Sequence, residues 1–425
     1  MVPSRLAIGA LVIMALAGVG GLWPASAAAQ VLVPPRPASL IDTPGQAYGV
    51  AVSRNLCLVS DHNAGVVLLD LGDPLAPVTL DTLDTPAFAR NAVIVGALAY
   101  LVDRASGLRI IDLSTPTDLV EVGAVDTPGL ALGLDVAGPY AYVADKGFGL
   151  QVVDIGDPAA PSIVGAVDTP DQASDVVVQG TLAYVADYLS GVRIIDIGDP
   201  LLPVEVGFLD TAGEANGLAI EGNLCVVADG TGGVVLLDVA DPGAPSLLAT
   251  LPTAGLATEV SLVGDIALVA DGAAGLAVVS VANPAAPVLV TSYATVGFAI
   301  QAQAMGRHVA VACGGSGVQV LEVFAAASRV PGPGPFARAV AVPNPFNPRT
   351  TIRFELADAA RVRVDIYDVS GRFVRTLVDG GLPAGLQQVS WDGRDAAGRA
   401  VSSGCYLARL ASAGTVQTVP IVLVR

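Results

Sequence analysis

Positively charged residues are scarce in this chain of 425 residues. Lysine and arginine together number 21 against 39 acidic residues, the formal net charge is −18 at pH 7, and the one lysine is Lys146. Clustered cations are what binds a nucleic-acid backbone, so this balance argues against a nucleic-acid partner. Such acidity helps a protein outside the cell to stay soluble.

Residues that commonly carry catalysis or bind metals are also few, with two histidines and four cysteines. Neither His62 nor His308 has a serine or cysteine partner at a recognisable nucleophile elbow, and no Cys-x-x-Cys or paired histidine marks a zinc site. We therefore expect no triad enzyme, no metal and no cofactor. The repeat described next separates the cysteines, so we expect four free thiols, at Cys57, Cys225, Cys313 and Cys405.

A block of 42 residues recurs seven times without an insertion or deletion. Each copy contains four short apolar runs, rich in Val, Ile and Tyr, that are separated by Gly, Pro and Asp turns. The markers are a glycine and, four residues earlier, an aspartate that becomes Cys313 in the last copy. The glycines are Gly65, Gly107, Gly149, Gly191, Gly233, Gly275 and Gly317, and the aspartates are Asp61, Asp103, Asp145, Asp187, Asp229 and Asp271.

A four-stranded unit of this length is typical of a propeller blade. Runs such as residues 66–69 are apolar on both faces, as expected for sheets that are stacked face to face. The seventh copy stops near Phe324, and residues 40–44 repeat the Asp-Thr-Pro ending of the fourth strands. We therefore predict an all-β fold, a seven-bladed β-propeller with 42-residue blades in which an N-terminal strand closes the last blade.

The aspartates have two interpretations. The Asp61 carboxylate could accept a backbone N–H two residues on and form an Asx turn, closed by Gly65 at positive φ. Alternatively, rings of carboxylates from the Asp61 and Asp70 series could bind calcium. No Asp-x-Asp-x-Asp-Gly loop is present, so we favour turn capping.

The repeat block resembles the LVIVP repeats of bacterial and archaeal surface proteins. The matching residues are Tyr-Val-Ala-Asp at 142–145 and 184–187, and Val-Val-Asp-Ile-Gly-Asp-Pro at 152–158 with its counterpart at 194–200. The resemblance covers about residues 38–324. It implies a propeller in the envelope or outside the cell, and no particular activity.

Both ends of the chain differ from the repeats. Residues 1–29 have a positive start at Arg5, an apolar region and an Ala-x-Ala ending, which predicts a cleaved secretory signal rather than a retained anchor. No later segment has 18 uninterrupted apolar residues, so we expect no transmembrane segment after cleavage. The propeller should thus span residues 30–324, and a Pro/Gly linker residues 325–340.

Residues 341–425 should form a small immunoglobulin-like β-sandwich of six or seven strands. This tail is similar to the immunoglobulin-like C-terminal domain of flagellar hook-capping proteins and of type IX secretion sorting tails. The matching segments are Asn-Pro-Phe-Asn-Pro at 344–348, Ile-Tyr-Asp-Val-Ser-Gly-Arg at 366–372 and Trp-Asp-Gly-Arg-Asp at 391–395. The resemblance implies a bacterial secretion machinery as partner. The final strand, however, lacks the usual lysine.

One rim of the propeller is the candidate binding face. In propellers the loops that precede the innermost strands share a face with the turns between second and third strands. Here these are the segments near residues 45–49 and 61–65 of each unit; position 47 is always Ala, whereas its neighbours vary. Variation on a rigid frame is where ligand contacts arise. The candidate ligand-binding residues are Tyr48, His62, Arg90, Arg104, Lys146, Phe148 and Tyr188.

Three functions remain open on these observations. The chain favours an exported, non-catalytic propeller at the cell surface or in the medium that binds or displays a carbohydrate, peptide or surface polymer, with the tail directing secretion or attachment. A structural surface-layer or matrix component is the alternative. An extracellular propeller hydrolase or lyase is less favoured, since Asp175 and Glu259 are the only acids at the position of Gly49.

Overall fold

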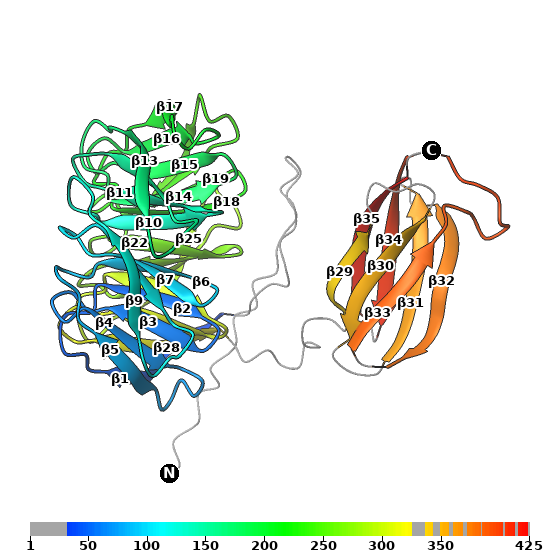
Figure 1. Ribbon diagram of the computed structural model, residues 1–425, viewed down its shortest axis with the longest axis horizontal. Helices are drawn as coiled ribbons and strands as arrows, with labels where there is room; N and C mark the ends of the chain where they lie inside the picture. Colours follow the sequence, from blue (N-terminus) through cyan, green and yellow to red (C-terminus); the bar gives the residue numbers. More distant parts are fainter. Residues whose placement is uncertain are drawn as a thin grey trace, which may run out of the picture. The chain divides into compact units, whose positions relative to one another are not determined.

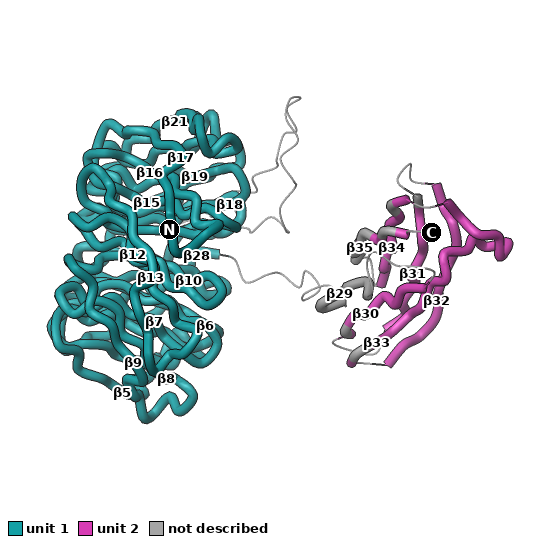
Figure 2. Tube along the Cα trace, turned by 45° about the horizontal axis from the view of Figure 1, so that its top comes forward, with its two compact units in different colours: residues 1–326 teal, residues 327–425 magenta. Residues whose placement is uncertain are grey.

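The computed structural model describes residues 32–324, 336–342, 349–356, 360–368, 372–383, 385–402, 404–412 and 415–423. The chain divides into two compact units, residues 1–326 and 327–425 (Figure 2). The predicted signal at residues 1–29 and the greater part of the predicted linker lie outside the described residues. Within the described part, no helix is long and apolar enough to cross a membrane.

The first unit consists of seven four-stranded antiparallel sheets, which confirms the predicted seven-bladed propeller (Figure 1). The innermost strands of blades 1 to 7 are β2 (Gly49–Ser53), β6 (Asn91–Val95), β10 (Gly133–Ala137), β14 (Asp175–Gln179), β18 (Gly217–Glu221), β22 (Glu259–Val263) and β26 (Gln301–Met305). The second strands are β3 (Leu56–Ser60), β7 (Leu98–Val102), β11 (Tyr140–Ala144), β15 (Leu182–Ala186), β19 (Leu224–Ala228), β23 (Ile266–Ala270) and β27 (His308–Ala312).

The outer half of each blade completes the sheet. The third strands are β4 (Val66–Asp70), β8 (Leu108–Asp112), β12 (Leu150–Asp154), β16 (Val192–Asp196), β20 (Val234–Asp238), β24 (Leu276–Ser280) and β28 (Val318–Phe324). The fourth strands are β5 (Val78–Leu83), β9 (Val120–Val125), β13 (Ser162–Val167), β17 (Val204–Leu209), β21 (Ser246–Leu251) and β25 (Val288–Tyr293) in blades 1 to 6. Innermost strands of neighbouring blades contact each other, and β2 contacts both β6 and β26, so the ring is closed.

The seventh blade takes its outer strand from the other end of the propeller, as predicted. β1 (Leu32–Ile41) pairs antiparallel with β28, with Ile41 opposite Val318 and Leu32 opposite Phe324. β1 has the sequence LVPPRPASLI and its pairing contains two register shifts. Proline cannot donate to a sheet ladder, so its prolines are compatible with this edge position only.

The core of the propeller lies between the blades. Seven clusters of buried apolar residues each combine side chains from two neighbouring blades. Along β3, Cys57 and Val59 pack toward blade 7, whereas Leu58 packs toward blade 2. Each sheet is therefore buried on both faces, which explains the apolar runs that do not alternate. Cys57, Cys225 and Cys313 are buried and free, whereas the Cys405 side chain lies outside the description.

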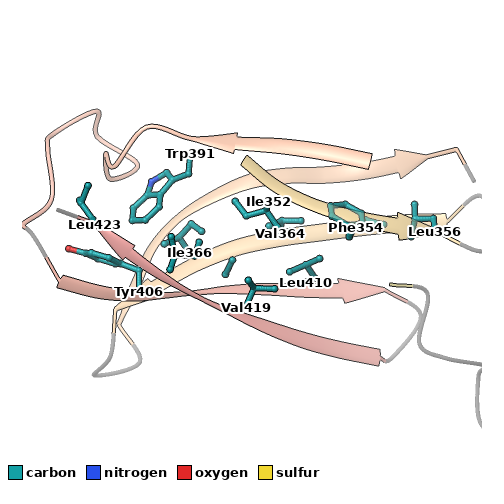
Figure 3. Packing of buried hydrophobic residues seen from close by; sticks show 13 residues of the cluster. Ile352, Phe354, Leu356, Val364, Ile366, Trp391, Tyr406, Leu410, Val419 and Leu423 are labelled. Carbon is teal, nitrogen blue, oxygen red and sulfur yellow. The ribbon is translucent and has the colours of Figure 1, made fainter. Parts of the chain in front are cut away.

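The second unit is a two-layered β-sandwich. One sheet has the order β29 (Phe336–Val342), β30 (Thr350–Leu356), β33 (Gly385–Trp391). The other has the order β32 (Phe373–Leu382), β31 (Ala360–Asp368), β34 (Gly404–Ser412), β35 (Thr415–Leu423). Trp391 and Tyr406 from the two sheets meet edge to face, with ring centroids 5.0 Å apart (Figure 3). Because β29 begins at Phe336, this domain starts earlier than predicted and includes residues 336–340 of the expected linker.

Candidate functional site

A ring of seven isolated β-bridges joins neighbouring blades on one rim. Each bridge pairs the invariant alanine before an innermost strand with the first residue of the preceding blade's turn between second and third strands. The pairs are Ala47–Gly314, His62–Ala89, Arg104–Ala131, Lys146–Ala173, Tyr188–Ala215, Gly230–Ala257 and Gly272–Ala299. All seven alanines are fully buried. The two backbones lie at hydrogen-bond distance there, which explains why the position stays alanine. We call this rim the mouth face.

The Asp61 series stabilises the mouth face in a way that differs from the predicted Asx turn. One Asp61 carboxylate oxygen accepts from the Thr43 hydroxyl at 2.6 Å and the other from the Gly45 N–H at 2.6 Å. The Thr and Asp recur with this bond in blades 1 to 6. This threonine and the strand-end aspartate, 18 residues apart, are thus one clamp that holds six of the seven inter-blade loops.

The Asx turn is instead made by the Asp70 series, where Asp70 accepts the Gly72 N–H at 2.8 Å. Burial raises the pKa of Asp61, whereas the hydrogen bonds from Thr43 and Gly45 lower it, and burial has the larger effect. Within the described residues, no group of three or more His, Cys, Asp or Glu is arranged to hold a metal ion. Gly65 lies at φ +71°, as predicted, and a Cβ there would meet the Leu83 carbonyl at 2.2 Å.

The first residue of each turn adopts a left-handed backbone conformation in every blade. Blades 5 to 7 have glycine there, with φ between +54° and +58°. Blades 1 to 4 instead have a bulky residue at this position: His62 at φ +51°, Arg104 at +40°, Lys146 at +48° and Tyr188 at +50°. The left-handed region costs a non-glycine residue roughly 1–2 kcal/mol. Four consecutive blades therefore carry a conformational cost that three blades avoid.

A pocket of about 250 Å³ opens at the centre of the mouth face. Its wall includes the residue after the invariant alanine from all seven blades: Tyr48, Arg90, Leu132, Ser174, Asn216, Thr258 and Ile300. Asn91, Glu259 and Gln301, one residue further on, lie deeper along the innermost strands, and Glu214, Leu256 and Phe298 come from the loops. Side chains from every blade thus converge on one pocket at the ring centre.

Five side chains from blades 1 and 2 form a layered stack beside this pocket. The His62 ring stacks between those of Tyr48, at 4.8 Å between centroids, and Phe88, at 4.2 Å. The Arg90 guanidinium carbon lies 5.4 Å from the Tyr48 centroid, and that of Arg104 lies 5.9 Å from the Phe88 centroid. Both distances are within cation–π range. Burial lowers the pKa of His62, and the charges of Arg104 and Arg90 act in the same direction, which favours the neutral ring in the middle layer.

Below the pocket, polar side chains satisfy the open edges of the innermost strands. Gln301 accepts the Val50 N–H of the next blade at 2.7 Å, and Asp175 accepts that of Leu218 at 3.1 Å. Burial raises the pKa of Asp175 to about 7. Burial, with the charge of Asp175, also raises the pKa of Glu259 well above its usual range. Asp175 therefore joins two blades as an acceptor, whereas Glu259 accepts the N–H of Val260 in its own strand.

The repeats match a known family. The LVIVD repeat model matches residues 44–85, 88–127, 128–169, 170–211, 212–253 and 254–295, which together make up more than half of the chain. The chain belongs to the LVIVD-repeat family. The repeats are thus of the LVIVD type rather than the LVIVP type expected from the sequence. The matches to the family model end at residue 295 and do not include the seventh blade, which has Cys313 in place of the clamp aspartate. The structure shows that this blade has the same four-stranded sheet as the others.

The other comparisons agree with the architecture. The FlgD Ig-like domain model matches residues 346–415. Among solved structures, a chain of a mitotic checkpoint complex is 12% identical and covers 75% of this chain and 100% of its own, with a TM-score of 0.59. The RRP9 WD40 repeats are 12% identical and cover 68% of this chain and 97% of their own, with a TM-score of 0.56. The computationally designed Ika8 protein is 11% identical and covers 67% of this chain and 98% of its own, with a TM-score of 0.53. At these identities the likeness concerns the fold alone. No curated protein matches the sequence.

The LVIVD propeller brings four of the seven predicted site residues together, namely Tyr48, His62, Arg90 and Arg104. Lys146, Phe148 and Tyr188 follow around the same face on blades 3 and 4; the Tyr188 hydroxyl is hydrogen-bonded to Glu214, which raises its pKa. Sequence reasoning missed Phe88, Phe298 and Glu214. All three occupy the residue before the invariant alanine, so comparing that position among the repeats would have found them.

Proposed function

We propose that this protein is an exported, non-catalytic β-propeller that binds a ligand at the mouth face, on the side of blades 1 to 4. The observation that carries the proposal is the bulky, left-handed residue retained at the start of four consecutive turns where glycine would be favoured. Residues with backbone strain of this kind concentrate at functional sites. The central pocket and the stack beside it are the second support.

A binding screen tests this proposal. The secreted full chain is applied to a glycan and peptide array, and a triple variant, Arg90→Ala with Arg104→Ala and Tyr188→Ala, is applied in parallel. We expect the parent chain to bind a defined subset and the triple variant to lose it. Unchanged binding by a folded triple variant would place the ligand elsewhere, whereas absence of any bound ligand would favour a structural surface-layer or matrix component.

We also propose that the FlgD Ig-like domain directs secretion or surface attachment, and that the protein acts at the cell surface or in the medium. Support comes from the match of this domain and from the apolar N-terminal sequence. The test fractionates the native host after expression of the full chain or of a chain ending at Phe324, which removes the whole of β29 (Phe336–Val342). The full chain should reach the surface or medium while the shorter chain stays in the periplasm. Equal distribution would refute a sorting role.

A hydrolase or lyase is the competing function, and one observation favours it. Asp175 and Glu259 have raised pKa values near the central pocket, and such groups occur at catalytic sites. The bond from the Leu218 N–H to Asp175 gives a structural reason for the same burial. Hydrolysis of any array ligand that disappears in an Asp175→Asn, Glu259→Gln double variant would establish the enzyme.

A further inference from the structure

We infer that the ligand of the mouth face is an acidic oligosaccharide, whose carboxylates are bound by Arg90 and Arg104 and whose hydroxyls are bound by Asn91 and Asn216. This inference rests on the proposed binding function and specifies its ligand. It follows from the placement of charge, from the geometry of the stack and from the free polar groups in the pocket.

Three cations without ion pairs lie on this side of the mouth face of an acidic protein. Eight cations lie within residues 32–324, in a chain of net charge −18. Arg109, Arg193 and Arg307 form ion pairs with acids. Arg90, Arg104 and Lys146, in blades 2 and 3, form no ion pair with any described residue. Unpaired cations grouped on an acidic protein select an anionic ligand.

The stack holds the two guanidinium groups ready for such a ligand. Arg90 lies against the Tyr48 ring and Arg104 against the Phe88 ring, at opposite ends of three stacked rings. Because a guanidinium on a ring face keeps its N–H donors free at its edge, each group can take one carboxylate through two parallel bonds. Two separated guanidinium groups suit carboxylates on successive units of a ligand chain. This makes a polymer or oligomer a better fit than a single anion.

The pocket supplies hydrogen-bonding groups that suit hydroxyls. Asn91 Oδ1 accepts the Ala92 N–H and Asn216 Nδ2 donates to the Ala257 carbonyl, which fixes both amides. The Asn91 Nδ2 and the Asn216 Oδ1 have no partner among the described residues, and both side chains line the pocket. One fixed donor and one fixed acceptor match hydroxyls, since a hydroxyl both donates and accepts. The Glu214 carboxyl group in the pocket wall adds a further acceptor.

An acidic peptide has the same charge but fits this pocket less well. Any apolar side chains that it carries would face the free amide groups of Asn91 and Asn216 in the pocket wall. Buried polar groups left without partners oppose binding. A sugar ring can also lie on exposed aromatic surface, such as Phe298 at 44% exposure. The observations therefore favour the carbohydrate over the peptide.

The test is calorimetric titration of the full chain with three probes of matched length. These are an oligogalacturonate, the neutral oligosaccharide made by reducing its carboxyl groups, and a glutamate homopeptide. Two variants are titrated beside the parent chain. Arg90→Gln removes one of the two guanidinium groups, and Arg54→Gln is the matched control. Arg54 is exposed in the hairpin between β2 and β3, at the end of β2 that is remote from the mouth face. Thermal unfolding confirms that both variants are folded.

We expect the oligogalacturonate to bind at least tenfold more tightly than the neutral oligosaccharide, and this preference to fall as salt is raised. Arg90→Gln should weaken its binding about 10- to 100-fold, the effect of losing a hydrogen bond to a charged group, whereas Arg54→Gln leaves it unchanged. Equal binding of the neutral sugar would refute the acidic ligand while supporting the binding function. Tighter binding of the peptide would refute the carbohydrate. Failure of all three probes refutes this inference, and the array above then decides the binding function independently.

Discussion

The left-handed residue at Lys146 gives the sharpest test of the mouth face, because its cost can be measured without a ligand. Lys146 lies at φ +48°, and its side chain makes no hydrogen bond or ion pair with any described residue. Replacing it with glycine removes a strain of roughly 1–2 kcal/mol but adds roughly 0.5–1 kcal/mol of backbone entropy lost on folding. We therefore expect Lys146→Gly to stabilise the propeller by about 1 kcal/mol.

Two controls separate backbone strain from side-chain effects. Lys146→Ala removes the side chain but keeps the strain, so it should leave stability unchanged. Gly314 occupies the equivalent position in blade 7 at φ +55°, and a Cβ there would have Ile300 Cδ1 as its nearest neighbour at 3.8 Å. Gly314→Ala therefore meets no clash and should destabilise the fold by about 1 kcal/mol through its backbone conformation alone.

Calorimetry of the propeller transition is the assay. For a domain of this size, about 1 kcal/mol corresponds to a shift of about 2–4 °C in Tm, upward for Lys146→Gly and downward for Gly314→Ala. If Lys146→Gly is no more stable than Lys146→Ala, the residue carries no strain, and the main support for a site on blades 1 to 4 is lost. A stabilised glycine variant that also loses ligand would demonstrate that stability has been exchanged for binding.

Two further predictions concern the clamp and the ring interior. Asp145→Ala removes the acceptor of the Thr127 hydroxyl and of the Gly129 N–H, both at 2.7 Å. In denaturant unfolding, this variant should destabilise the propeller by about 2–4 kcal/mol, whereas Cys313→Ala in blade 7 should destabilise it by about 1 kcal/mol. Equal losses of stability in the two variants would mean that the clamp contributes nothing. The pKa of Asp175 is raised to about 7 from 3.8, so its contribution to stability is complete below pH 4 and is lost as the pH rises through 7. Asp175→Asn can still accept the Leu218 N–H, and it should therefore be more stable than the parent chain at pH 8 by roughly 2–4 kcal/mol. Its free energy of unfolding should also decline less between pH 5 and pH 8. Parallel curves of unfolding free energy against pH for the two chains would contradict this assignment.

The sequence by itself determined the architecture, because a repeat forces equivalent residues into equivalent places. The 42-residue period and the extra Asp-Thr-Pro copy at residues 40–44 were enough to predict seven blades closed by β1, and the glycine of the repeat predicted the positive φ found at Gly65. The invariant Ala47 and the variable Tyr48 beside it likewise pointed to the mouth face. In all of these, a local pattern fixes a local conformation, and repetition multiplies the signal.

The tertiary structure alone decided which partners those residues meet. The Asp61 carboxylate reaches back to Thr43 rather than along its own turn, because the inter-blade loop runs beside the end of the second strand. The stack of Tyr48, His62 and Phe88 joins residues up to 40 positions apart across two blades, and Asp175 bonds to Leu218 of the next blade. Such contacts depend on how one blade is packed against another, and a sequence pattern read one repeat at a time carries no information on that packing.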